Sequence, residues 1–212
     1  MTLSTQAVDV VSVIAGGWSF SQVPQDQVPG YRIAVNDAAF HLAKPPDEIV
    51  SMDRQWTEHR LQALLQARIP TYLRRSAVQN LHDKISGRPW INIFDCDNES
   101  FSMTHAPYTL NGTNSGMCAL NRAYKIATKE VYLFGFDMCL GPDGEKHWYP
   151  DYDWPYQLKP GKLREWSPQF ARVGQQFRDR NVQLFNVSNR TQITGISTVW
   201  LWTLARFNEN RD

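Results

Sequence analysis

The sequence lacks the features that define several classes of protein. Its three cysteines form no CxxC pair and are odd in number, which argues against a disulfide framework or a zinc site and fits a reducing compartment. The net charge is only +1, so the bulk composition does not require a nucleic-acid or membrane partner. No apolar run is long enough to cross a bilayer, and the N-terminal segment has no basic region of the signal-peptide kind. We therefore expect a cytoplasmic protein.

Several catalytic signatures are also missing. The chain contains neither the GxGxxG dinucleotide fingerprint nor a phosphate-binding loop ending in Gly-Lys-Ser/Thr. It has no GxSxG nucleophile elbow, and no Cys/His pairing indicates a covalent hydrolase. No spacing of His, Cys and Asp residues matches a transition-metal site. These absences leave ligand binding without a classical fingerprint as the question to answer.

What the sequence does contain is a regular alternation of short apolar runs and helical patterns, in a chain that is 42% hydrophobic. Such alternation predicts an α/β fold, with a mainly parallel sheet and helices on both faces, in a single domain over residues 1–212. Pro168 predicts a kink or a late start in the helix expected at 161–181. The expected strands are 8–16, 31–37, 47–53, 69–76, 89–97, 129–138 and 182–188, the last clear one; the expected helices are 54–68, 114–127, 161–181 and a terminal helix at 198–212.

Polar residues follow most of the predicted strands. Because ligands of open parallel sheets bind outside the carboxyl ends of the strands, we expect these residues to cluster around one site. They are Gly16, Gly17, Asn36, Asp37, Asp53, Asp95, Asp97 and Asp137.

Two segments have the composition of a phosphate-binding site. "AGGWSF" (15–20) follows the first strand, and its glycines permit close approach of the backbone to a ligand, although a plain tight turn accounts for it equally well. "NSG" (114–116) opens a helix, where Asn114 or Ser115 is a good N-cap and the same donors suit an anion. The polar stretch "NGTNSG" exceeds what a cap alone needs.

Two Asp-x-Asp patterns, at 95–97 and at 151–153, and one histidine complete the candidates. Asp95 and Asp97 at a strand end form an Asp-x-Asp pattern suited to Mg²⁺ on a diphosphate, although a solvated turn is an equal alternative. Residues 139–160 form a connection longer than a compact domain needs, which predicts an active-site loop. His147 lies in that loop among aromatic and acidic residues, and imidazole can exchange a proton with a hydroxyl near neutral pH.

In combination, these motifs resemble one superfamily: the Campylobacter-type bacterial sialyltransferases, the motility accessory factors and the archaeal hydroxymethylpterin diphosphokinase. The resemblance lies in "IAGGWSF" (14–20), "IAVNDAAF" (33–40), "NSGMCALNRAYKIATKEVYLFGFDM" (114–138), the histidine of the next loop and "VQLFNVSNRTQITGI" (182–196). Their order and spacing hold over most of the chain. The chain departs from the family by lacking its first-loop asparagine, by Trp18 in place of proline and by Asp37 in place of glutamine.

The resemblance implies a Rossmann-like, GT-A-like domain that moves a sugar from a nucleotide-activated donor to a hydroxyl acceptor, with no cofactor required. His147 would be the base, and Tyr149, Tyr152 or Tyr156 would bind the leaving phosphate. The donor would be bound by Gly16, Gly17, Ser19, Asn36, Asp37, Asn114, Ser115, Gly116 and Asp137.

The resemblance also leaves alternatives open. One is an ATP- and Mg²⁺-dependent diphosphotransferase that uses Asp95, Asp97 or Asp37, and another is a nucleotide-binding protein without catalysis. Small members of this kind occur in bacteria and phages, so DNA is an alternative acceptor if the chain is phage-encoded. A basic face of residues 74–75, 84, 88, 159, 162 and 164 would then serve DNA binding, although a solvated surface is the plainer interpretation. Relatives often assemble, so the resemblance leaves a homo-oligomer open, and no residue of the sequence decides it.

Overall fold

The computed structural model describes residues 7–97, 102–155 and 160–199. Within them the strands are β1 (Val8–Ile14), β2 (Tyr31–Val35), β3 (Glu48–Ser51), β4 (Thr71–Arg74), β5 (Ile91–Phe94), β6 (Ala127–Phe134), β7 (Gln183–Val187) and β8 (Ser197–Val199). The α-helices are α1 (Ala38–His41), α2 (Arg54–Ala67), α3 (His82–Ile85), α4 (Ser115–Ile126), α5 (Pro160–Trp166) and α6 (Gln169–Asp179). Short 3-10 turns occupy Trp18–Gln22, Gln25–Gln27, Arg75–Ala77 and Gln79–Leu81.

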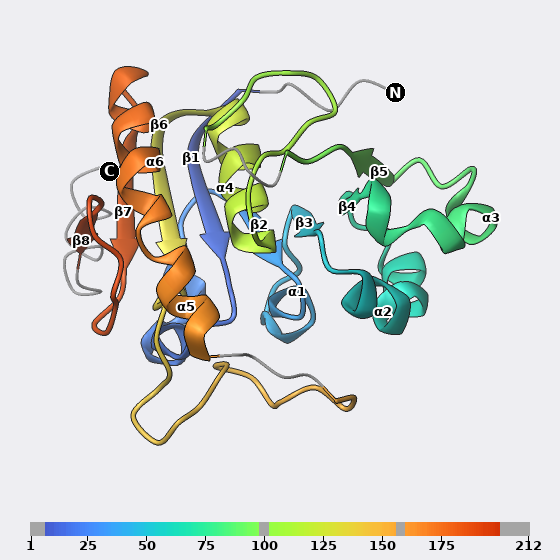
Figure 1. Ribbon diagram of the computed structural model, residues 1–212, viewed down its shortest axis with the longest axis horizontal. Coiled ribbons are helices and arrows are strands. Elements are labelled where there is room, and N and C mark those ends of the chain that lie inside the picture. Colours follow the sequence, from blue (N-terminus) through green and yellow to red (C-terminus); the bar gives the residue numbers. More distant parts are fainter. Residues whose placement is uncertain (1–6, 98–101, 156–159, 200–212) are drawn as a thin grey trace.

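The eight strands form one parallel sheet in the order β5-β4-β3-β2-β1-β6-β7-β8 (Figure 1). The chain proceeds outward from β1 to β5, then crosses back through α4 to place β6 beside β1. Strand order therefore reverses between β1 and β6. In doubly wound sheets a crevice opens at such a reversal, outside the carboxyl ends of the strands.

The sheet is covered on both faces because its strands are apolar on both sides. Ile33 and Val35 of β2 pack in a cluster with α4 and α6, whereas Ala34 between them packs in a second cluster with α1 and α2. Successive side chains of a strand point to opposite faces, so one continuous apolar run serves two layers. This arrangement confirms the predicted α/β fold with a parallel sheet and helices on both faces.

Most of the predicted elements are found within a few residues of their expected bounds. The helix expected at 161–181 is divided, since α5 ends at Trp166 and α6 begins at Gln169, with Pro168 as its N-cap. Proline has no backbone N–H to continue the hydrogen-bond ladder of α5. The sequence predicts a kink or a late start at this residue, and the structure has two separate helices there.

The end of the sheet differs from prediction. The segment 182–188 is not the last strand, because β8 (Ser197–Val199) pairs in parallel with β7. Two residues assigned to a terminal helix, Thr198 and Val199, are in this strand, and the remainder of that helix lies outside the described residues. Three residues are too few for a period of two to be recognised, so the strand depends on pairing with β7. No helix in the described ranges is both long and apolar enough to span a membrane.

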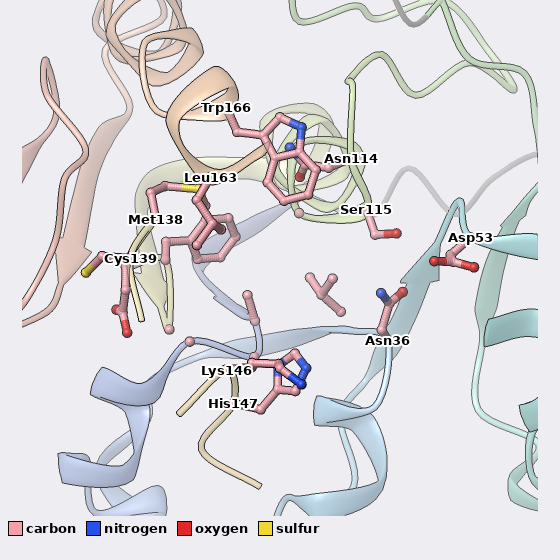
Figure 2. Close-up of a pocket in the computed structure, with 18 of the residues that line it drawn as sticks. Asn36, Asp53, Asn114, Ser115, Met138, Cys139, Lys146, His147, Leu163 and Trp166 are labelled. Carbon is pink, nitrogen blue, oxygen red and sulfur yellow. The ribbon is translucent and has the colours of Figure 1, made fainter. Parts of the chain in front are cut away.

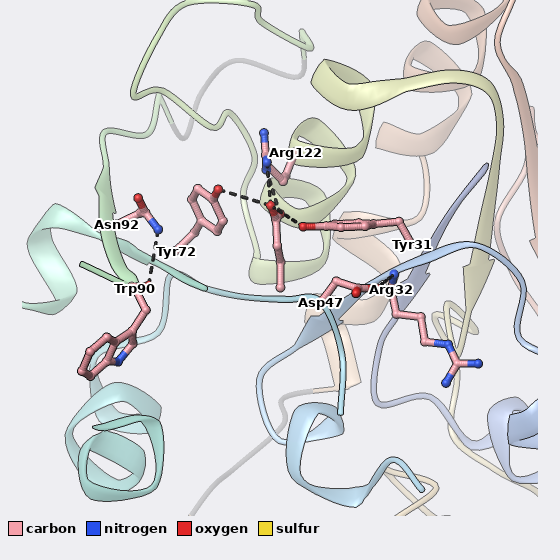
Figure 3. A network of polar contacts seen from close by, with 8 residues as sticks. Tyr31, Arg32, Asp47, Tyr72, Trp90, Asn92 and Arg122 are labelled. Carbon is pink, nitrogen blue, oxygen red and sulfur yellow. Dashed lines mark hydrogen bonds and ion pairs between the residues drawn. The ribbon is translucent and has the colours of Figure 1, made fainter. Parts of the chain in front are cut away.

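The crevice lies outside the carboxyl ends of the strands. At their amino ends, a buried ion pair ties α4 to three of the strands, β2, β3 and β4 (Figure 3). Arg122 of α4 donates from Nε and Nη2 to the carboxylate of Glu48 at 2.8 and 2.6 Å. The hydroxyls of Tyr31 and Tyr72 donate to the same carboxylate at 3.0 and 3.3 Å. Burial, and then the charge of Glu48, raise the pKa of both tyrosines well above the usual range, so both remain donors. The network secures α4, whose other end faces the crevice.

Candidate functional site

A cavity of about 370 Å³ lies outside the carboxyl ends of the central strands, where the strand order reverses. Figure 2 shows its side chains converging from the sheet, from α4 and α5 and from the loop after β6. Its size falls within the range of small-molecule sites. It is lined by residues 15–17, 35–36, 52–53, 113–116, 135–139 and 146–147, together with Leu163 and Trp166.

The loops after β1 and β6 form the floor of this cavity, in direct backbone contact. The N–H of Gly17 donates to the carbonyl of Gly135 at 2.9 Å, and a Cβ on Gly17 would lie 2.4 Å from that oxygen. Only glycine fits such an approach. Because Gly17 uses its N–H within the floor, this donor is not directed at a ligand.

Asp137 joins the same two loops. Its Oδ2 accepts from the N–H of Ser19 at 2.8 Å, and its Oδ1 accepts from the hydroxyls of Ser19 and of Ser188. Burial raises the pKa of this carboxyl, while the hydrogen bonds from Ser19 oppose the rise. Asp137 lines the cavity, whereas Ser19 is buried behind it and is used to position the loop rather than to line the site.

The first turn of α4 forms one wall of the cavity. Asn114 is the N-cap, and its Oδ1 accepts from the N–H of Met117 at 3.0 Å. This bond orients the amide, so Nδ2 is the donor; it is buried and has no partner among the described residues. Ser115 accepts from the N–H of Met52 at 3.1 Å, and a Cβ on Gly116 would lie 3.1 Å from the Phe136 ring. The first N–H groups of a helix have no intrahelical acceptor, and the cap uses only that of Met117, so the N–H groups of Ser115 and Gly116 and the Nδ2 of Asn114 are the hydrogen-bond donors of this wall.

Asn36 faces this wall from the end of β2. Its φ of 51° lies in the left-handed region, which asparagine tolerates better than most residues. Its Oδ1 is buried and has no partner in the described ranges. Neighbouring Asp53 also lines the cavity, but its Oδ1 accepts from the N–H of Trp56 at 2.9 Å as the N-cap of α2. Two unsatisfied amide groups, on Asn36 and Asn114, thus point to a ligand with both donor and acceptor atoms.

His147 lines the cavity from the loop after β6. Both ring nitrogens are buried, and the ring stacks on Tyr149 at 4.9 Å, which in turn stacks on His41 at 4.7 Å. Burial lowers the pKa of His147 below its usual value, with Asp151 acting in the opposite direction. The imidazole is therefore neutral at neutral pH, the form that accepts a proton. The backbone beside His147 is bonded to the first loop, since the N–H of Trp148 donates to the carbonyl of Gly16 at 3.0 Å. This bond fixes the position of the His147 loop relative to the cavity floor.

Of the three tyrosines predicted to bind the leaving phosphate, Tyr149 and Tyr152 lie around the His147 ring and do not line the cavity. Tyr149 is buried beneath His147, and the ring of Tyr152 lies 5.3 Å from the His147 ring, in an edge-on arrangement. Tyr156 lies outside the described residues.

Three predicted acidic residues do not line the cavity. Asp37 turns into the protein and is 1% exposed, because Arg60 and the indole N–H of Trp56 bind its carboxylate. Asp95 lies beyond β5 near the edge of the sheet and forms an exposed pair with Arg75 at 2.7 Å. Asp97 is exposed beside it. The predicted cluster of strand-end residues is thus reduced to Gly16, Gly17, Asn36, Asp53 and Asp137.

The described part of the chain brings together no group of three or more His, Cys, Asp or Glu side chains that could bind a metal ion. Its three cysteines form no disulfide, and Sγ of Cys96 and of Cys118 are 3.8 Å apart.

Sequence reasoning missed the side of the cavity formed by α5 and by the start of the long loop. Leu163 and Trp166 reach the cavity from α5, while Met138, Cys139 and Lys146 come from the chain after β6 (Figure 2). No pattern in the sequence indicates that α5 lies beside the first turn of α4. Lys146 is adjacent to the predicted histidine, and this adjacency is the one signal by which it could have been found.

The fold of this chain, unlike its sequence, matches known proteins. No protein-family model matches the sequence, and a search of the curated proteins gives no match. Among solved structures, the MAf glycosyltransferase from Magnetospirillum magneticum AMB-1 superposes with a TM-score of 0.60 at 16% identity, over 93% of this chain and 34% of that one. This chain shares its fold.

A second solved structure agrees with the first. The sialyltransferase CstII from Campylobacter jejuni, in complex with the substrate analogue CMP-3FNeuAc, superposes with a TM-score of 0.54 at 12% identity, over 90% of this chain and 86% of that one. The chain spans about a third of the length of the Magnetospirillum protein. Both likenesses support the predicted Rossmann-like fold; at these identities the reaction is a matter for proposal.

Proposed function

We propose that the protein is a glycosyltransferase that moves a sugar from a nucleotide-activated donor to a hydroxyl acceptor. The observation that carries this proposal is a buried, neutral His147 in the same cavity as the start of α4, which presents several hydrogen-bond donors. The fold around this cavity is shared with two glycosyltransferases. A neutral imidazole can remove the proton of a hydroxyl, and helix N-terminal donors can stabilise a departing phosphate.

The proposed reaction is a direct displacement. The acceptor hydroxyl attacks the anomeric carbon as His147 takes its proton, and the bond from that carbon to the phosphate oxygen breaks. Asn114 Nδ2, the first N–H groups of α4 and the Lys146 ammonium stabilise the nucleotide that leaves. Asn36 binds the polar part of the donor. Tyr149 and Tyr152 support the His147 ring, in place of the phosphate contacts implied by the resemblance.

The first test is a thermal-shift screen of CMP, UDP, GDP, ADP and ATP, each with and without Mg²⁺. A ligand at ~100 times its Kd should add about 2.7 kcal/mol to the free energy of unfolding. The proposal is supported by a Mg²⁺-independent shift with one of the nucleotides that occur in nucleotide-sugars, followed by transfer or hydrolysis of the corresponding nucleotide-sugar. A shift with ATP and Mg²⁺ alone would favour a diphosphotransferase. Binding without turnover would favour a nucleotide-binding protein, and no shift at all would contradict the proposal.

Asn114 allows the helix cap and the ligand contact to be separated. In Asn114→Asp the carboxylate still accepts from Met117 N–H, so the cap and the stability of the fold should be retained. The Nδ2 donor is replaced by an acceptor of like charge to phosphate, so nucleotide binding should weaken about 10- to 100-fold. Isothermal titration with the nucleotide selected by the thermal screen checks this.

The control for Asn114 is the alanine variant, which removes both functions. Asn114→Ala should weaken binding and also cost about 1 kcal/mol of stability by loss of the cap. Nucleotide affinity equal to wild type in both variants would show that this wall does not contact the ligand.

Gly16 sets the position of the proposed base. A Cβ at this residue would lie 2.8 Å from both His147 Nδ1 and the Tyr149 hydroxyl, closer than carbon can approach either atom. Gly16→Ala should therefore displace the imidazole and lower kcat for sugar transfer by about 100-fold, the cost of a displacement near 1 Å. Gly161→Ala is the matched control, because nothing lies within 4 Å of a Cβ there. Unchanged kcat in Gly16→Ala would mean that His147 can shift without consequence.

A further inference from the structure

The loop that carries His147 has a second attachment, on α2, made by residues that do not line the cavity. Gln55, His59 and Arg60 of that helix all contact residues 153–155. Gln55 and His59 are four positions apart and therefore lie on the same side of the helix, and Arg60 directly follows His59. The backbone contact through Trp148 fixes the loop at one point, and α2 fixes it at another.

Trp154 is the centre of this second attachment. Its ring is 7% exposed and stacks on His59, with centroids 4.4 Å apart and planes within 4°. The Arg60 guanidinium lies 4.6 Å from the Trp154 centroid. Tyr152 stacks on Trp154 at 4.4 Å, and its ring also meets the His147 ring at 5.3 Å. Contact therefore runs without interruption from α2 through two aromatic rings to the proposed base.

Arg60 is itself held in position by a buried carboxylate. Its Nε and Nη2 donate to the two oxygens of Asp37 at 2.8 and 2.7 Å, and the Trp56 indole N–H donates to the same group at 2.7 Å. A bidentate guanidinium–carboxylate pair fixes the plane of the guanidinium as well as its place. This accounts for Asp37, which follows β2 yet does not line the cavity.

From this arrangement we infer that Asp37, Arg60 and Trp154 form a clamp, which holds the loop against α2 and thereby positions His147 for the proposed reaction. Arg60 and Trp154 are positioning residues, because they act through Tyr152 and do not line the cavity. The inference rests on the proposed function for its effect on catalysis. The restraint of the loop can be measured separately.

The variant that tests the clamp is Trp154→Ala, which removes the stacked ring without leaving a buried charge unpaired. Trp90→Ala is the matched control, since Trp90 also lies near arginine side chains, those of Arg68 and Arg88 at 5.7 and 5.9 Å, but does not line the cavity. Arg60→Lys is the conservative variant, which keeps the charge opposite Asp37 and loses the planar group over Trp154.

The first readout needs no substrate. Trypsin cleavage after Lys146 in the native protein should be at least about 10-fold faster in Trp154→Ala than in wild type or Trp90→Ala, because native cleavage depends on local opening. The His147 imidazole, assigned in NMR spectra with a His147→Gln sample, should titrate closer to the usual pKa once water reaches it. Asp151, Lys146 and Asp37 are the charged groups that act on this ring, and all three are retained in the variant.

The second readout is steady-state kinetics with CMP-, UDP- and GDP-linked sugars. Trp154→Ala should lower kcat by about 100-fold with little change in KM for the donor, and Arg60→Lys should lie between it and wild type. Wild-type cleavage and titration in Trp154→Ala would overturn the clamp. Faster cleavage with unchanged kcat would also overturn it, as the loop would be loosened without effect on the base. If wild type transfers no sugar, the proposed function fails, and cleavage and titration still decide whether α2 restrains the loop.

Discussion

His147→Gln should lower kcat for sugar transfer by about 10²- to 10⁴-fold, the usual contribution of a general base, while nucleotide affinity changes little. Glutamine is close to imidazole in length but cannot take up a proton. The donor-rich wall of α4 is unaltered by this change, so binding and turnover should separate. Steady-state kinetics and nucleotide titration on the same samples measure the two effects.

The pH dependence provides an independent signature of the same residue. Because burial lowers the pKa of His147, kcat/KM in wild type should hold down to a pH below about 6.5 before it falls. His147→Gln should lack this acid limb. The folded state binds this proton less readily than the unfolded state, so the contribution of His147 to stability is complete above pH ~6.5 and is lost as the pH falls through the folded-state pKa. The free energy of unfolding should therefore decline more steeply in wild type than in the variant.

The control for His147 is His41→Gln. His41 stacks on the other face of Tyr149 and does not line the cavity, so its loss perturbs the same ring stack without removing the base. This variant should retain kcat within a few-fold and keep the acid limb. Equal loss of activity in both variants would show that the stack, and not proton transfer by His147, is what matters.

Arg122→Met should destabilise the fold by about 3–5 kcal/mol, because it leaves the Glu48 carboxylate buried with no opposite charge. The two side chains are 2% and 1% exposed, and the remaining donors, Tyr31 and Tyr72, supply hydrogen bonds without charge. Urea denaturation measures the change. The cavity lies at the other end of α4, so the nucleotide affinity of the protein that remains folded should be unaltered.

Two further variants show whether burial is the cause. Arg75→Met breaks an equally short pair with Asp95, but those side chains are 61% and 55% exposed, so the loss should stay within about 0–1 kcal/mol. Replacing both partners, with Glu48→Leu and Arg122→Met together, should recover much of the stability lost in the single variant. A double variant as unstable as Arg122→Met would show that the unpaired charge of Glu48 is not the cause of the lost stability.

The sequence and the structure agree most closely where the interactions are local. The run at 129–138 is apolar enough to be recognised as a buried strand, and β6 occupies most of it. Asn114 is an N-cap as expected, since a cap depends on residues within three positions of it. The sequence indicates His147 because the loop carrying it is longer than a compact domain needs and follows the predicted strand that ends near Asp137.

Disagreement begins where a side chain can choose between partners that are distant in sequence. Asn36 and Asp37 are adjacent, yet one lines the cavity and the other points into the protein. Nothing local separates them, and the outcome depends on Arg60 and Trp56 of α2. Asp95 likewise has an exposed arginine as its partner instead of a second carboxylate and a cation.

By itself, then, the sequence of this protein determines a parallel α/β sheet, the cap of α4 and a histidine in the loop after β6. Periodicity, capping and loop length are properties of neighbouring residues, so they can be recognised without coordinates. Only the tertiary structure decides that Asp37 binds Arg60, that β8 extends the sheet and that Leu163 and Trp166 close one side of the cavity. These features arise from contacts between elements far apart in the chain, and no local pattern encodes which distant partner a side chain will meet.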